Sequence, residues 1–172
     1  MVRTQLLLTF FLVAVAGCDT TDTPTTAPDR GIVNLHPDFP VIEGFYQMAE
    51  NWSVTLPSSY NRRIEDESMV MWRPGFTIWM QIYGNDDGRS NDEVVAQLQA
   101  ESSPDAFDSL TETDNNVLRF SYRLNESGDD DRVAAFYCFS VSDSGYVMMA
   151  IYFDDAGGID DALNIWRSVR QT

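Results

Sequence analysis

The sequence predicts an α+β domain: a single antiparallel sheet packed by one or two short helices and a C-terminal helix. Apolar and polar residues alternate in several short stretches, which is the periodicity of β-strands. Turn sequences such as Pro-Gly, Asp-Ser-Gly and Gly-Asn-Asp-Asp-Gly separate these stretches. Two other segments carry helix-start signals, and the second of them closes the chain.

The first strand is expected in NWSVTLP, where apolar residues occupy every second position from Trp52 to Leu56. Pro57 is expected to end it, because proline cannot donate a ladder hydrogen bond. A second strand is expected over residues 62–67. The preceding segment, residues 31–50, contains two prolines and predicts only an extended approach to the domain.

Five further strands follow from turns and alternation. Residues 69–73 and 76–83 flank a Pro-Gly pair, which indicates a hairpin. Residues 117–124 predict a strand with one face toward water. Residues 133–141 and 146–153 flank an Asp-Ser-Gly turn and are apolar on both faces, so they are expected at the centre of the sheet. The water-facing residues of the 117–124 strand would be Val117, Arg119, Ser121 and Arg123.

Two helices are expected. Ser90 and Glu93 fit a capping box, and an apolar stripe of Val94, Val95 and Leu98 follows them. Ser103-Pro104 indicates one more helical turn, since proline is favoured at the first helical position.

The closing helix has Asp160 and Asp161 in its first turn and Arg167 and Arg170 in its last, which matches the helix dipole. Its apolar stripe consists of Ala162, Leu163, Ile165, Trp166 and Val169.

The chain begins with a short apolar run, Leu6 to Ala16, which is 11 residues long. A helix of that length reaches about 17 Å, against a hydrocarbon core of about 30 Å, so it is too short to span a membrane. With Arg3 before it and small residues after it, the run is typical of a signal peptide over residues 1–17. The tetrapeptide Val15-Ala16-Gly17-Cys18 resembles the lipobox of bacterial lipoproteins.

That resemblance implies that the chain is cut before Cys18 and that the cysteine carries acyl chains inserted in the lipid bilayer. Residues 18–30 hold the lipidated cysteine and a Thr/Pro/Asp spacer, and residues 31–172 form a single globular domain outside the cytoplasm. Asp19 resembles the signal that retains some lipoproteins in the inner membrane. The alternative is an ordinary signal peptide cut after Gly17.

The composition is strongly acidic: 27 Asp and Glu oppose 11 arginines, there is no lysine, and the net charge is −16. Nucleic acid is excluded as a partner, because no basic patch can displace counterions from phosphates. A surface so rich in short carboxylates also favours a halophilic or marine source, where salt screens their mutual repulsion.

The globular part resembles the PsbP-like fold, which includes bacterial envelope lipoproteins of the DcrB type. The resemblance rests on the succession NWSVTLP, MVMWRPGFTIWMQIY, the helix that begins SNDEVV, three strands and a C-terminal IWRSV helix. It implies an accessory or binding module, and the fold by itself fixes no chemistry.

Few residues suit catalysis. His36 is the only histidine, and it precedes Pro37 in the approach segment. A nucleophilic dyad or a zinc site would need it. Cys138 lies in the apolar run VAAFYCFSV, which predicts a buried, unreactive thiol. We therefore expect no enzyme activity and no cofactor.

Carboxylates are the remaining candidates. Asp154, Asp155, Asp160 and Asp161 flank a Gly-Gly loop and are the best candidates for a calcium site. The adjacent helix N-terminus repels a cation, so solvated turn and helix-start aspartates are the preferred interpretation. Met71, Trp72 and Trp79 could present a partner surface, but core packing is expected because tryptophan is usually buried.

The sequence thus predicts a membrane-anchored lipoprotein of the cell envelope whose non-catalytic domain binds or assists an unidentified envelope protein. A carboxylate-dependent hydrolase and a calcium-stabilised structural module remain the alternatives.

The acidic surface generates a first prediction. The melting temperature should rise as NaCl is raised from low concentration to molar concentration, because salt screens carboxylate repulsion. Thermal unfolding followed by circular dichroism measures it. A melting temperature that stays constant or falls with salt would contradict the adaptation to high salt.

Overall fold

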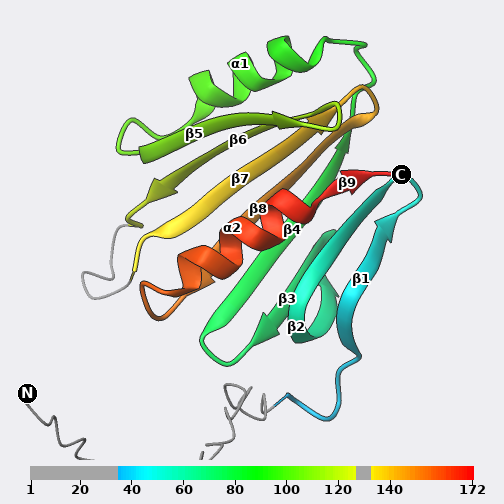
Figure 1. Cartoon of the computed structure of the whole chain (residues 1–172), viewed down its shortest axis with the longest axis vertical. Helices are drawn as coiled ribbons and strands as arrows, with labels where there is room; N and C mark the ends of the chain where they lie inside the picture. The colour runs from blue at the N-terminus through cyan, green and yellow to red at the C-terminus, as the bar shows by residue number, and fades with distance from the viewer. Residues whose placement is uncertain (1–34, 127–132) are drawn as a thin grey trace, which may run out of the picture. The chain divides into compact units, whose positions relative to one another are not determined.

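The computed structural model describes residues 35–126 and 133–172, and these form a sheet-dominated α+β domain. Nine strands make one antiparallel sheet in the order β1-β2-β3-β4-β8-β7-β6-β5, and β9 pairs with β2 (Figure 1). The strands are β1 (Val41–Ala49), β2 (Trp52–Glu65), β3 (Ser68–Arg73), β4 (Phe76–Gly84), β5 (Phe107–Asp114), β6 (Val117–Leu124), β7 (Ala135–Ser142), β8 (Gly145–Phe153) and β9 (Arg170–Gln171). The helices are α1 (Asn91–Glu101) and α2 (Gly158–Ser168).

The signal peptide of residues 1–17, Cys18 and the spacer lie outside the described residues, as does most of the turn between β6 and β7. Within the described part, no helix combines the length and the apolar character needed to cross a membrane. The described residues belong to one compact unit, Ile32–Thr172.

The prediction that Pro57 ends a strand is wrong, because β2 runs through it to Glu65 and joins the two strands expected separately. Pro57 is tolerated because it lies where the ladder is interrupted. The register with β1 shifts between the Leu56–Gly44 and Tyr60–Ile42 pairs, and pairing with β3 starts only at Asn61. A missing amide hydrogen costs no ladder bond at such a bulge.

Other boundaries also differ from the sequence predictions. The segment expected only as an extended approach contains β1, an edge strand of the sheet. No helical turn forms at Ser103-Pro104; the chain instead turns into β5, whose residues are almost all exposed and so carry no alternating pattern. Arg170, expected in the last helical turn, lies in β9, because α2 ends at Ser168.

The two expected hairpins, β3–β4 and β7–β8, are confirmed, and β7 and β8 lie in the interior of the sheet as predicted. Gly145 begins β8 with φ +136°, and an added Cβ would lie 2.0 Å from the carbonyl oxygen of Tyr83. Only glycine allows this close approach of β8 to the end of β4.

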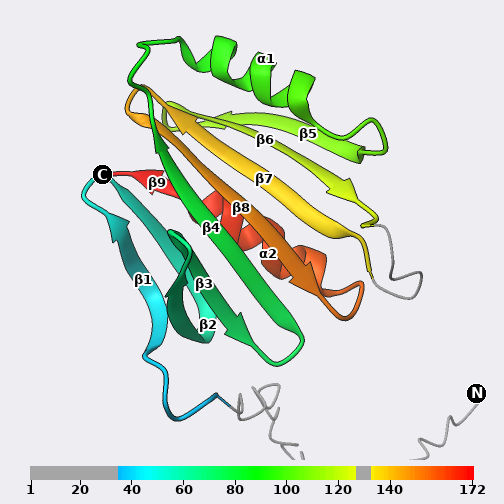
Figure 2. The same cartoon turned by 180° about the vertical axis from the view of Figure 1, so that it is seen from behind.

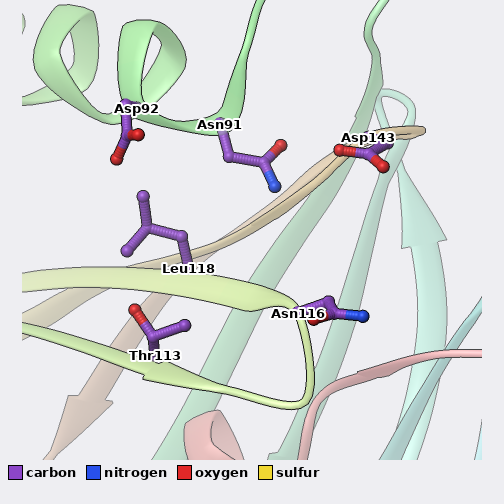
Figure 3. Close-up of a pocket in the computed structure, with 6 residues that line it drawn as sticks. All are labelled: Asn91, Asp92, Thr113, Asn116, Leu118 and Asp143. Atoms are coloured by element: carbon purple, nitrogen blue, oxygen red, sulfur yellow. The ribbon is translucent and has the colours of Figure 1, made fainter.

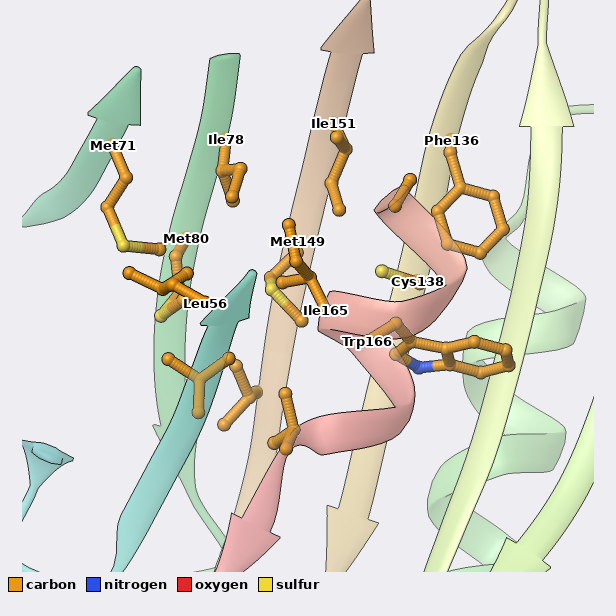
Figure 4. Packing of buried hydrophobic residues seen from close by; sticks show 14 of the residues in the cluster. Leu56, Met71, Ile78, Met80, Phe136, Cys138, Met149, Ile151, Ile165 and Trp166 are labelled. Atoms are coloured by element: carbon orange, nitrogen blue, oxygen red, sulfur yellow. The ribbon is translucent and has the colours of Figure 1, made fainter. Parts of the chain in front are cut away.

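Helix α2 packs across one face of the sheet and forms the main core with it (Figures 1 and 4). The predicted stripe is confirmed: Ala162, Ile165, Trp166 and Val169 are buried, and Leu163 packs beside them. The indole nitrogen of Trp166 donates to the carbonyl oxygen of Phe139 at 3.0 Å, so the largest side chain of the helix is both packed and hydrogen-bonded.

Helix α1 lies on the opposite face, where it packs on β6 and β7 through the predicted residues Val94, Val95 and Leu98. Its capping box is confirmed: the Ser90 hydroxyl accepts from the amide of Glu93, and the Glu93 carboxylate accepts from the amide of Ser90. Hydrogen bonds from the Ser90 amide and hydroxyl to the Glu93 carboxylate lower the pKa of Glu93. Figure 2 shows that β3, β4 and β8 carry no helix on this face.

The predicted water-facing side of β6 is instead buried. Arg119 and Ser121 are inaccessible to solvent, because β6 lies next to the C-terminal end of α2. The Arg119 guanidinium donates to the carbonyl oxygens of Val169 at 2.8 Å and of Arg167 at 3.3 Å. Burial lowers the pKa of Arg119, and Asp114 lies 4.0 Å from it. The last carbonyls of α2 have no donor within the helix, and they fix the position of this buried cation.

Arg119→Ala should lower the free energy of unfolding by about 3 kcal/mol, because it opens a cavity in the interior and removes the hydrogen bonds to the Val169 and Arg167 carbonyls, which among the described residues keep only the Arg170 guanidinium as a side-chain donor. Arg62→Ala, a change of the same kind at a partly exposed site of β2, should cost less than about 0.5 kcal/mol. Urea unfolding of the two variants measures the difference. Equal losses would show that Arg119 does not hold the end of α2.

Candidate functional site

The four candidate metal ligands do not form one cluster, and each has its own surroundings. Asp161 accepts from Arg73 at 2.8 Å, which ties α2 to β3. The Asp155 carboxylate accepts from the amide of Gly157 at 2.8 Å within its own turn. The Asp154 side chain faces Gly75, while Asp160 is exposed. Among the described residues, no three His, Cys, Asp or Glu side chains are grouped so that they could hold a metal ion.

The two residues considered for nucleophilic catalysis lie in different surroundings. Cys138 is fully buried in the core, as predicted, and burial raises the pKa of its thiol. His36 is half exposed and packs against Phe39. The buried side chain of Asn61 fixes this approach segment, because it accepts from the amide of His36 at 2.6 Å and donates to its carbonyl at 2.9 Å.

A polar pocket of about 360 Å³ lies at one end of the sheet (Figure 3). The start of α1, the β5–β6 hairpin and the β7–β8 turn line it, and Asp92 and Asp143 supply its two carboxylates. The two carboxylates disfavour binding of an anion in this pocket, and the positive end of the α1 dipole disfavours binding of a cation. Its other lining residues are Asn91, Thr113, Asn116 and Leu118.

The aromatic residues of β3 and β4 are divided between the two faces. Met71 is buried in the core, as expected, but Trp72 and Trp79 are only partly buried and lie on the opposite face, over strands that α1 does not cover. Trp72 has neighbours from this chain: Phe39 meets it edge-on at 4.9 Å, and the Arg63 guanidinium lies 5.0 Å from its ring centroid. Trp79 is different, because it lines an open groove.

This groove, which we call the aromatic notch, has a volume of about 270 Å³ and lies over Ala150. Trp79 on β4 and Tyr137 on β7 both pair with Ala150 on β8 and flank it across the sheet. Met148 and Tyr152 flank Ala150 along β8, and Ser68, Met80 and Gln81 complete the lining on the β3–β4 side. A small side chain surrounded by large ones creates a recess in the sheet face.

The Tyr137 wall of the notch is held in position. Its ring stacks on Tyr122 of β6 at 5.3 Å, so its opposite ring face points toward β8 and Ala150. The Glu126 carboxylate accepts hydrogen bonds from both Tyr137 and Tyr152, the latter at 2.9 Å. Burial and the hydrogen bond to Glu126 raise the pKa of Tyr137, so its hydroxyl stays a donor at physiological pH.

The chemistry of the notch suits binding. The described residues that line it provide aromatic faces, a thioether, an amide and hydroxyls, and none of them carries a charge, an imidazole or a thiol. A ligand would gain contact area and hydrogen-bond partners there.

No family model matches this chain, and no curated protein matches it either.

The notch was not identified from the sequence. The alternation of β8 indicates that Met148, Ala150 and Tyr152 share one face. The identity of the neighbours of Ala150 depends on β8 lying between β4 and β7, and that order needs the long-range pairing of the sheet.

The placement of the aspartates generates a prediction about calcium. Asp161→Asn should lower the melting temperature more than Asp160→Asn does, because both changes remove a carboxylate from the first turn of α2 but only Asp161 also pairs with Arg73. Millimolar calcium should change the melting temperature of the native chain no more than magnesium does at equal ionic strength. A calcium-specific increase that Asp160→Asn abolishes would favour the calcium-stabilised module.

Proposed function

We propose that the protein is a lipid-anchored, extracytoplasmic lipoprotein of the cell envelope whose globular domain is a non-catalytic binding module. The observation that carries the anchor is Val15-Ala16-Gly17-Cys18 directly after the apolar run Leu6 to Ala16. The succession of elements that resembles PsbP-like envelope lipoproteins agrees with the same interpretation.

The anchor is physically sufficient. Each buried methylene contributes about 0.8 kcal/mol, and a single acyl chain binds a bilayer only weakly and reversibly. The two or three chains of a lipoprotein would hold the domain at the membrane for long periods. The 12 residues from Asp19 to Arg30 span up to about 37 Å when extended, so the domain would reach partners away from the lipid surface. Asp19 favours the inner membrane.

The binding role is supported by the face of the sheet opposite α2. Only part of that face is covered by α1, and partly exposed aromatic side chains lie on β3, β4, β7 and β8. Exposed aromatic clusters of this kind mark interaction surfaces in soluble domains. The partner would be a protein of the envelope.

The anchor is tested by intact mass and by partition between detergent and water after expression of the full chain in a bacterium. The native chain should carry diacylglycerol on Cys18 and enter the detergent phase, while Cys18→Ser should do neither. Thr20→Ala is the matched control, because it alters the neighbouring sequence without removing the thiol. A native chain without lipid, cut after Gly17, would overturn the anchor.

A further inference from the structure

The aromatic notch has room for one flat group between two rings. Trp79 and Tyr137 stand on strands separated by two strand spacings, about 9.5 Å, with the small Ala150 between them. Because a planar group stacks on an aromatic ring at about 3.5 Å, two side chains that rise from strands at this spacing leave room for one such group between them. Because Tyr122 supports the Tyr137 ring from behind, this wall needs little reorganisation when a ligand enters.

The neighbouring tryptophan shows which group suits this sheet face. The guanidinium of Arg63 lies over Trp72, and its Nη2 atom lies 2.6 Å from the Glu65 carboxylate. Aromatic face, guanidinium and oxygen acceptor thus form one arrangement beside the notch. At the notch, Trp79 supplies the ring, and the side-chain oxygens of Ser68 and Gln81 are the acceptors that line it. The Glu126 carboxylate, which does not line the notch, accepts from the hydroxyls of Tyr137 and Tyr152.

Charge favours the same group. The chain has a net charge of −16, and no described residue that lines the notch is cationic. A cation is therefore attracted to this surface at long range, and an anion is repelled. Guanidinium is planar, carries five donors and no acceptor, and stacks on aromatic faces better than the compact ammonium of lysine.

We propose that the aromatic notch binds an arginine side chain of a basic partner protein, inserted between Trp79 and Tyr137 above Ala150. This inference specifies the partner of the proposed binding module. It rests on the proposed function only in taking the globular domain to be a binding domain. The guanidinium stacks on both rings, and its edge donates to the oxygens at the rim.

The test titrates hexa-arginine and hexa-lysine peptides, which carry equal charge, into the full-length chain in a mild nonionic detergent at about 0.15 M NaCl. Calorimetry gives the affinity, and tryptophan fluorescence reports contact with Trp72 and Trp79, because Trp52 and Trp166 are buried. The part of the fluorescence change that Trp79→Leu abolishes is the signal of the notch. The arginine peptide should bind about tenfold more tightly than the lysine peptide.

Three variants locate the effect. Ala150→Leu fills the notch from the sheet face and Trp79→Leu removes one ring, so each should reduce the preference for arginine to about onefold. Binding of the lysine peptide should stay unchanged in both. Ala96→Leu makes the same substitution at an exposed position of α1 and should keep the tenfold preference. Melting curves establish whether each variant is folded. If Ala150→Leu does not fold, Trp79→Leu alone tests the role of the notch.

Equal affinities for the two peptides in the native chain, or a preference that survives in both notch variants, would overturn the proposal. Two other results would also overturn it, if the native chain shows no preference for arginine. One is binding of a neutral oligosaccharide that the notch variants abolish, and the other is self-association in sedimentation that they abolish. The detergent assay does not require the acyl anchor. A failed lipidation test therefore leaves this result intact, and a failed peptide test leaves the anchor intact.

Discussion

Helix α2 buries Ile165 and Trp166 completely against one face of the sheet, and the rest of the domain is arranged around that contact. The contact supplies the main core, since burial of apolar side chains is the dominant stabilising term in folding. It also brings the unpaired carbonyls at the end of the helix into the protein interior. Arg119 reaches those carbonyls from β6, and β9 then continues the chain along β2. The acidic residue at the start of the helix pairs with Arg73 on β3, so both ends are attached to the sheet.

Because α2 covers only one face, the opposite face has to be completed in other ways. Helix α1 covers β6 and β7, and the capping box at Ser90 fixes where it begins. Over β3, β4 and β8, partly exposed aromatic rings take the place of a helix. Trp72 meets Phe39 edge-on and lies under the Arg63 guanidinium, and Tyr83 stacks on Tyr146, which shields part of their surface. The side chain at Ala150 is too small to continue this layer, and the recess that results is the aromatic notch.

The proposed anchor and the proposed notch are consistent with one physical picture. An acyl chain on Cys18 would restrict the domain to the volume near a membrane, which raises its effective concentration toward envelope partners. A strongly acidic surface repels nucleic acid and anionic lipid head groups, and it attracts basic proteins. Within that general attraction, a flat slot between two rings would select arginine over lysine, because specificity requires a feature that the competing cation cannot use.

The sequence by itself determined the local features: the capping box at Ser90, the hairpin turns, the buried stripe of α2 and the motif ending at Cys18. Each depends on residues within a few positions of one another. Only the tertiary structure decided the passage of β2 through Pro57, the burial of Arg119 and the neighbours of Ala150. These depend on which distant strands and helix ends lie alongside, since β4 joins β8 across the whole of α1, β5, β6 and β7. Periodicity reports which side of a strand a residue occupies, but not what covers that side.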